Sequence, residues 1–428
     1  MTGSQQTLYL YALPAFVLAM PTIPLFILLP TYYGEELGLG LAAVGLTFFV
    51  LRILDVVSDP ILGWISDRIQ SSFGRRKLPM LVGGVIAAPA LIALFNPPSN
   101  VSILYLFGCG AVLYVGWTAI QIPYLAWAAE ITSDYHTRSK LNGSREAAGL
   151  LGILAIGLFG VLFTDIPQSI QYFWLATLTV CLGTISFIIT FKFVPDKTGE
   201  KQNKQKFTFP HQNGLFKRLL TAWFINGLAN GLPAVCLPLF MTHILSAGET
   251  EKAWFLFLYF LAAAGGIPLW VSLAGKLGKH QVWCLSMCVA VLIFSAVPFL
   301  GEGDFILFGV ICILTGVTLG SDLTLPQAIQ ADCADWDRYR FGQDRIASLY
   351  AYWSMATKLA LGFAVGIAFP TLSFFELEQG GPYALDMLVF LYAGLPILLK
   401  LAAVGMMWSF PLNHKKHKFI QTLLERRS

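Results

Sequence analysis

Long apolar stretches alternate with short polar segments along the whole chain. A stretch of about 20 apolar residues is long enough to cross the hydrocarbon core of a bilayer as a helix. The pattern therefore predicts an all-α membrane protein with twelve transmembrane helices. They are expected near residues 9–30, 41–65, 78–95, 102–127, 141–163, 170–193, 219–243, 253–275, 281–300, 304–330, 346–370 and 383–411.

The first apolar stretch reads as a retained span. It has no basic segment before it and no small-residue cleavage site, which a secretory signal would carry. Pro14, Pro21 and Pro24 predict that this helix is bent.

A polar segment divides the spans into two sets of six. The sequence PDKTGEKQNKQK is too polar to cross a membrane, so residues 194–218 are predicted to be a cytoplasmic linker. It separates an N-terminal six-helix bundle, residues 1–193, from a C-terminal bundle, residues 219–411, and residues 412–428 form a cytoplasmic tail. A weak repeat supports this division: GWISDRIQSSFGRRK follows the second span and GKLGKH the eighth. Repeated halves around a central site are a common plan of transporters.

Composition and charge agree with a multi-pass membrane protein. The chain is 56% hydrophobic and 12% charged, with a mean hydropathy of +0.67, whereas soluble domains are about 25% charged. Most of the 28 basic residues fall in alternate loops, which predicts that both termini are cytoplasmic. The net charge of +4 is explained by this topology and gives no reason to expect a nucleic-acid partner. We expect a monomer in the cell membrane, the inner membrane in a bacterium.

The sequence contains no enzyme motif that we recognise and no cluster of metal-ligating residues. We therefore expect a protein that is not an enzyme and has no cofactor.

Ionisable residues interrupt the second span in the segment LRILDVVSDPILGWISDR, residues 51–68. At 100° per residue, Arg52, Asp55 and Asp59 form one stripe on the helix. A charge near a helix centre costs about 2.5–3.5 kcal/mol on insertion scales, so such groups usually face a protein interior or an aqueous cavity. The stripe is either an ion or solute path or a structural ion pair that ties helices together, with the spare carboxylate protonated. One arginine cannot neutralise both aspartates, which favours the path.

Other spans also carry charges and aromatic residues. For Glu146 in the fifth span and Asp322 in the tenth, a structural partnership with a base and a place in a cavity are both open; Lys400 in the twelfth is expected to extend toward a membrane interface. Trp117 and Tyr124 in the fourth span are candidates for stacking on a sugar ring, although helix packing is the more common role of such residues.

Four segments together resemble one transporter family. They are RILDVVSDPILGWISDR with FGRRK, then IQIPYLAWAAEIT, ADCADWDRYRFGQDR and MATKLALG. The chain resembles, over nearly its whole length, the glycoside-pentoside-hexuronide cation symporters of the melibiose permease type, in the major facilitator superfamily. The resemblance implies two six-helix bundles, alternating access, and cotransport of a monovalent cation with a solute.

The resemblance also implies site residues. Asp55 and Asp59 match the cation-site carboxylates, while Arg145 and Lys358 match basic residues of the fifth and eleventh helices that lie near the solute. The chain has Gln121 where galactoside carriers have a carboxylate before the fourth-helix Ile-Pro, and Ala19 where they have another in the first helix. Galactoside specificity is therefore not expected. We assign Gln121, as an amide oxygen, to both the cation site and the solute site.

The loop after the second span is expected to act as a cytoplasmic gate. The resemblance places a latch there, in which Asp67 pairs across the bundle and holds the outward-facing state. Arg68, Arg75 and Arg76 belong to the same loop. The alternative is a solvated loop that only fixes the topology.

Three functions are compatible with these observations. The first is symport of a glycoside-like or other small polar solute with sodium or a proton. The second is a carrier of a lysolipid or another amphiphile on the same fold. The third is a sensor or scaffold built on a carrier fold that no longer transports.

Overall fold

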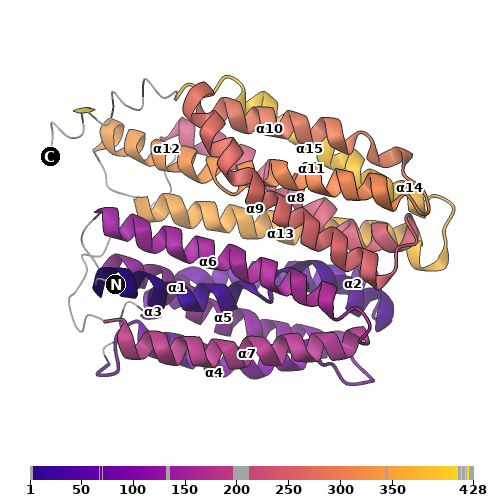
Figure 1. Ribbon diagram of the computed structural model, residues 1–428, viewed down its shortest axis with the longest axis horizontal. Helices are drawn as coiled ribbons and strands as arrows, with labels where there is room; N and C mark the ends of the chain where they lie inside the picture. Colours follow the sequence, from indigo (N-terminus) through magenta and orange to yellow (C-terminus); the bar gives the residue numbers. More distant parts are fainter. Residues whose placement is uncertain are drawn as a thin grey trace. The chain divides into compact units, whose positions relative to one another are not determined.

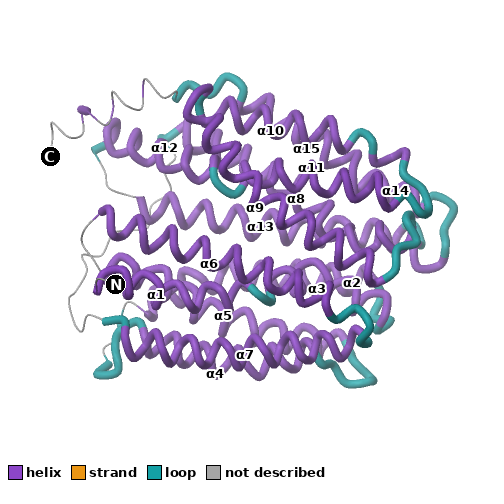
Figure 2. Tube along the Cα trace, viewed as in Figure 1, coloured by secondary structure: helices purple, strands orange, loops and turns teal. Residues whose placement is uncertain are grey.

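The structure is a computed structural model, and the residues it describes form helices joined by short loops (Figure 2). They are residues 3–66, 68–69, 71–131, 135–195, 212–342, 346–412, 416, 420 and 422–423; the side chains of 3–6, 129, 135–139 and 346–347 are not described. Among the described residues, 12 helices are long and apolar enough to cross a membrane. The predicted all-α fold with twelve spans is confirmed.

The chain divides into two compact units, Met1–Gln202 and Asn203–Ser428. The first unit carries the spans that precede residue 196, which are drawn in indigo to magenta in Figure 1. Its elements are α1 (Gly3–Ala19), η1 (Pro24–Leu28), α2 (Leu29–Thr31), η2 (Tyr32–Glu36), α3 (Leu41–Ser66), α4 (Lys77–Phe95), α5 (Ile103–Ile131), α6 (Tyr135–Leu162) and α7 (Gln168–Phe193).

The first span is interrupted near its middle, as the prolines predict. α1 ends at Ala19, and the chain continues through Pro21 into a π-helical turn that begins at Pro24. Proline has no N–H to donate and its ring displaces the preceding carbonyl, so the regular α-helical pattern cannot continue. The span then runs to Glu36, six residues beyond its predicted end.

The second unit contains the helices that follow residue 213. Its elements are α8 (Gly214–His243), α9 (Glu249–Leu277), α10 (Lys279–Phe294), η3 (Val297–Phe299), α11 (Phe305–Asp322), α12 (Leu325–Phe341), α13 (Ile346–Phe374), η4 (Leu377–Gln379), α14 (Ala384–Val389), η5 (Phe390–Gly394) and α15 (Leu395–Met407).

α8 starts at Gly214, inside the segment predicted to be linker. The side chain of the preceding Asn213 accepts a hydrogen bond from the Phe216 N–H at 2.9 Å, and its amide nitrogen donates to Asp337 at 2.8 Å. An asparagine cap satisfies an N–H that the first helical turn leaves without a partner. The boundary at 218 was therefore wrong for residues 214–218.

The tenth span is broken in two. α11 ends at Asp322, and α12 begins at Leu325 with Pro326 in its first turn. Proline is tolerated there because the first N–H groups of a helix have no partner within the helix. The break places Asp322 at a helix end inside a long span, Phe305–Phe341.

Two glycines allow close helix packing, one in each unit. A Cβ at Gly116 of α5 would lie 2.8 Å from the Ala87 nitrogen of α4, and a Cβ at Gly320 of α11 would lie 2.7 Å from the Ala263 oxygen of α9. Only glycine permits backbones to approach this closely.

Candidate cation and solute site

An ion pair is buried in the middle of α3. The Arg52 Nη1 lies 3.1 Å from the Asp55 Oδ2, and the two residues are only 6% and 3% exposed. The guanidinium also lies over the Phe26 ring, 3.7 Å from its centroid. An arginine that pairs with a carboxylate and stacks on an aromatic ring is well suited to an interior position, because both partners attract its positive charge. Arg52 and Asp55 thus form an ion pair within one helix, whereas the structural alternative was a pair that ties helices together.

Two hydroxyl groups also lie beside Asp55, and the sequence analysis missed both. Thr118 of α5 donates to the Asp55 Oδ1 at 3.0 Å. Ser58 donates to the Asp55 backbone oxygen at 3.0 Å and lies 3.4 Å from the Thr118 hydroxyl. Ser58 was detectable as a polar residue one turn after Asp55, and Thr118 lies one turn before Gln121. Both side chains are buried.

Asp59 follows one turn after Asp55 on α3 and is partly buried. On α5, Trp117 and Gln121 stand on either side of Thr118 in sequence and are partly buried as well. The structure thus brings α3 and α5 together at Asp55 and Thr118, and it supplies carboxylate and hydroxyl oxygens at that contact. Such hard oxygen ligands suit a small cation.

Arg145 lies in α6, where it pairs with the adjacent Glu146. Its side chain is 16% exposed and that of Glu146 is 67% exposed. Arg145 also interacts electrostatically with the hydroxyl groups of Tyr11 and Tyr124. Glu146 therefore has the structural partnership that was one of its two predicted roles.

Tyr124 packs in the core of the first unit. It is 1% exposed, and it exchanges hydrogen bonds with the backbone of Tyr11, whose own hydroxyl donates to the Tyr124 oxygen at 2.8 Å. The two ring centroids are 4.9 Å apart. In this conformation the ring joins α1 to α5, so a contact with solute stays a prediction.

Lys358 lies in α13 and is partly buried. It belongs to the second unit, whereas Arg145 belongs to the first. A cavity shared by these two basic residues stays a prediction.

The predicted gate loop is fixed to the first unit through Arg76. Its Nη2 and Nε lie 2.6 and 2.9 Å from the Glu130 Oε1 at the end of α5, and its Nη1 donates to Ser66 at 3.0 Å. Arg76 is 2% exposed, so it is not a solvated residue. The Arg75 Nη1 is 3.9 Å from the same carboxylate oxygen.

The remaining gate residues are Arg68 and Asp67. Arg68 is exposed, and its guanidinium lies over the Trp64 ring, 3.6 Å from the centroid. Asp67 lies outside the described residues. Its pairing across the bundle stays a prediction.

The second unit has a corresponding ion pair. The Lys279 Nζ, just after the eighth span, lies 2.6 and 2.7 Å from the two carboxylate oxygens of Asp332 in α12. Basic residues that follow the second and eighth spans thus bind carboxylates late in the fourth and tenth spans.

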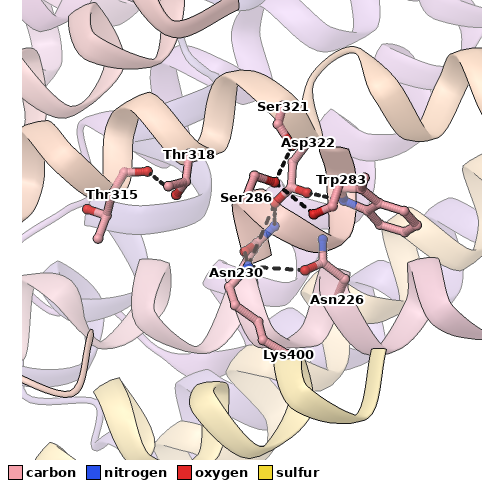
Figure 3. A network of polar contacts seen from close by, with 9 residues as sticks. All are labelled: Asn226, Asn230, Trp283, Ser286, Thr315, Thr318, Ser321, Asp322 and Lys400. Atoms are coloured by element: carbon pink, nitrogen blue, oxygen red, sulfur yellow. Dashed lines mark hydrogen bonds and ion pairs between the residues drawn. The ribbon is translucent and has the colours of Figure 1, made fainter. Parts of the chain in front are cut away.

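Lys400 was expected at a membrane interface, and that expectation was wrong. The residue is 7% exposed, and its Nζ lies 3.8 Å from the Asp322 Oδ2. Two asparagine oxygens of α8 accept hydrogen bonds from it, as Figure 3 shows. The anion and the two acceptors inside the bundle offset the cost of removing the ammonium from water.

Comparisons with known proteins agree with this architecture. A model of the family described as MFS/sugar transport protein matches residues 8–414. An uncharacterised symporter of Bacillus subtilis, YnaJ, is 24% identical, with 92% of this chain and 89% of that protein covered. The glucuronide carrier protein homolog of Escherichia coli is 22% identical over 93% of this chain and 90% of its own length.

Solved structures resemble the fold. A bacterial homolog of the human lysosomal transporter Spinster, in an inward-facing conformation, has a TM-score of 0.67 at 12% identity and covers 99% of this chain and 98% of its own. The nucleoside transporter NupG has a TM-score of 0.65 at 13% identity, with 95% and 99% covered.

Proposed function

The chain belongs to the MFS/sugar transport protein family, and from that premise we propose that it couples entry of a small polar, glycoside-like solute to a monovalent cation. Family membership makes it a secondary transporter of the major facilitator superfamily rather than an enzyme. The single observation that carries the coupling proposal is the buried cluster of Arg52, Asp55, Ser58 and Thr118 within an apolar span, with Asp59 one turn further along.

The cluster favours a small cation because it presents oxygen atoms at low exposure. Asp59 and Asp55 supply negative charge, and the Thr118 and Ser58 hydroxyls, with the Gln121 amide, supply neutral oxygens. Sodium or a proton bound there reduces the negative charge of the two carboxylates, which lowers the cost of closing the site away from water.

Coupling follows from a shared conformational equilibrium. If cation and solute both favour the closed carrier, each raises the affinity of the other by the same factor. In this proposal Arg145, Lys358, Trp117 and Tyr124 contact the solute. The loop with Asp67, Arg68, Arg75 and Arg76 lies on the cytoplasmic side, as do both termini, and controls opening to that side.

The solute class is supported by the names of relatives. The family description specifies sugar transport. The relatives include a glucuronide carrier homolog, an isoprimeverose transporter and a lactose permease. A lysolipid is not favoured by these names. Polar side chains at Gln121 and Arg145 fit hydroxyl or carboxylate groups of a glycoside better than an acyl chain.

Cation binding tests the proposal without knowledge of the solute. Thermal unfolding of the purified protein is followed in sodium chloride and in choline chloride, at acidic and at alkaline pH, since a ligand of the folded state raises its apparent stability. Sodium should stabilise the wild type and should not stabilise Asp59→Asn; if the coupling ion is a proton, the part of the acid response that Asp59 carries should be lost in that variant. The matched control is Glu302→Gln, an exposed carboxylate in the loop before α11, which should respond as the wild type does.

A cation response as large in Asp59→Asn as in the wild type would refute the assignment of the site. Uptake into proteoliposomes then tests the solute, with radiolabelled lactose, methyl β-D-glucuronide and isoprimeverose as probes and lysophosphatidylcholine as competitor. Transport of the lysolipid in place of the glycosides would overturn the solute class.

A further inference from the structure

A second charged cluster lies inside the second unit, apart from every residue assigned above to cation or solute. Asp322, the last residue of α11, and Lys400 of α15 are 6% and 7% exposed. Their charged atoms are 3.8 Å apart, too far for a direct hydrogen bond. Figure 3 shows that side chains from neighbouring helices converge on the pair.

Neutral side chains bridge the two charges. The Asn230 Nδ2 donates to the Asp322 Oδ2 at 2.8 Å, and the Asn230 Oδ1 accepts from the Lys400 Nζ at 2.7 Å. The Trp283 Nε1 donates to the other carboxylate oxygen at 2.6 Å. The Asn226 Oδ1 accepts from the Lys400 Nζ at 3.1 Å. This arrangement suits an ionised carboxylate and an ammonium, because every one of these contacts matches a donor to an acceptor.

One donor of the cluster has no partner. Asn226 is fully buried, and its Nδ2 has no hydrogen-bond partner among the described residues. Exchanging the amide oxygen and nitrogen does not help, since the oxygen already accepts from Lys400. Figure 3 shows this nitrogen on the side of the cluster where Trp283 and Asp322 lie. A buried N–H without an acceptor is costly, and a buried water molecule commonly satisfies such a group.

The cluster is also placed at a structural discontinuity. Asp322 ends α11 immediately before the break in the tenth span. A negative charge is unfavourable at the C-terminal end of a helix dipole, and here Lys400, Asn230 and Trp283 offset that effect. Removal of the charge by a proton would therefore change both the helix end and the partnership with Lys400. Broken helices with charged groups at the break are a recurrent feature of transporter sites.

Few other titratable groups face Asp322. The Tyr259 hydroxyl of α9 interacts electrostatically with the carboxylate, and α15 contributes Lys400. The side chains that α8 and α10 direct at the pair are Asn226, Asn230 and Trp283. α10 also carries Cys284, adjacent to Trp283, and His280, whose ring lies against Phe410. α12 begins beyond the break with the apolar Leu325.

We propose that Asp322, with Lys400 as its counter-charge, is a proton-binding site of the C-terminal bundle, separate from the cation cluster of α3 and α5. The proton comes from water and binds a carboxylate oxygen of Asp322, which becomes a neutral acid, while Lys400 keeps its own proton and retains the two asparagine oxygens. The pair therefore changes from net neutral to a single positive charge. The inference rests on the transport function proposed above, and it gives transport a pH dependence that does not originate at Asp55 or Asp59.

Infrared spectroscopy tests this directly on the purified full-length protein in lipid, with protons as the only ligand. Difference spectra between alkaline and acidic pH report the C=O stretch of carboxyl groups that become protonated. One component should be absent in Asp322→Asn and present in Asp59→Asn. Spectra of Asp322→Asn that equal those of the wild type would overturn the proposal. Asp322 would then stay ionised over the whole pH range and have only a structural role.

A double variant keeps the test valid if Asp322→Asn does not fold. Asp322→Asn leaves Lys400 buried opposite a neutral amide, whereas Asp322→Asn with Lys400→Met removes both charges. If only the double variant folds, it should lack the same infrared component. The rate at which it exchanges solute should also no longer change on acidification. A purely structural pair predicts wild-type pH dependence in the double variant, and that result would also refute the site.

The outcome is separable from the proposed symport. The sodium response of thermal stability should persist in Asp322→Asn and should be lost in Asp59→Asn. If neither sodium nor acid gives a response that depends on Asp59, and the Asp322 component is nevertheless observed, the coupling proposal at α3 fails while the proton site stands.

Discussion

Each six-helix unit buries a carboxylate beside a basic residue and among hydrogen-bond donors. The two units differ in how far apart the carboxylate and the base lie along the chain. In the first unit Arg52 precedes Asp55 by one helical turn on the same helix. In the second unit Lys400 reaches Asp322 from another helix, with asparagines of a third between them. A local pair can form before the bundle assembles, whereas a non-local pair requires the packed bundle. The first cluster should therefore tolerate conformational change in the bundle better than the second.

The largest expected effect is on coupling. Asp59→Asn preserves the shape of the side chain and removes its charge, so gradient-driven accumulation should be abolished while solute binding and downhill exchange persist. The measurement is uptake into proteoliposomes, with and without an imposed sodium or proton gradient, of whichever of lactose and methyl β-D-glucuronide the wild type accumulates. Undiminished cation-dependent accumulation in the variant would contradict the assignment. Loss of solute binding alone would move Asp59 to the solute site.

The next comparison is between the ion pairs that follow the second and eighth spans. The side chain of Arg76 is 2% exposed, whereas that of Lys279 is 37% exposed. Removing one partner of a buried pair costs about 3–5 kcal/mol because the other charge is left in the interior, whereas exposed pairs contribute about 0–1 kcal/mol. Arg76→Ala should therefore lower the unfolding temperature in a given detergent much more than Lys279→Ala does. Equal losses would mean that burial does not distinguish the two pairs.

Much of the fold was predictable from the sequence because each span is long, apolar and bounded by polar loops. The gate side of the first unit was partly predictable too, since FGRRK is conspicuous after the second span. Its chemistry was not, because the carboxylate that binds Arg76 is Glu130, which lies far along the chain.

The candidate sites show the same limit. Arg52, Asp55 and Asp59 could be placed on one helix face from their spacing alone. Thr118 could not be matched to Asp55, because a threonine in an apolar helix usually bonds its own backbone and carries little signal. Lys400 was misplaced for a related reason. A lysine in a span is ordinarily expected to extend toward water, and nothing local indicates that α8 and α11 provide its partners.

Helix packing should respond similarly in the two units. An alanine at Gly116 or Gly320 would place its Cβ within 3 Å of backbone atoms, and overpacking of this kind typically costs about 1–3 kcal/mol. Gly108→Ala, on the same helix as Gly116, has nothing within 4 Å and should leave stability unchanged or raise it slightly. Unfolding temperatures of the three variants decide this. A loss at Gly108 equal to that at Gly116 would attribute the effect to something other than close packing.

The smallest expected effects separate the chemistry of the two clusters. Thr118→Val removes the hydroxyl that donates to Asp55 and keeps the shape of the side chain, and a hydrogen bond to a charged group contributes about 1.5–3 kcal/mol. The variant also removes a neutral oxygen from the proposed cation site, so sodium affinity should fall by about tenfold, which corresponds to 1.4 kcal/mol. Trp283→Phe removes the donor to Asp322 in the other unit and should leave sodium affinity unchanged while shifting the pH at which the Asp322 infrared component appears. A change in sodium affinity on Trp283→Phe, or a shift of the infrared component on Thr118→Val, would show that the two clusters act as one site.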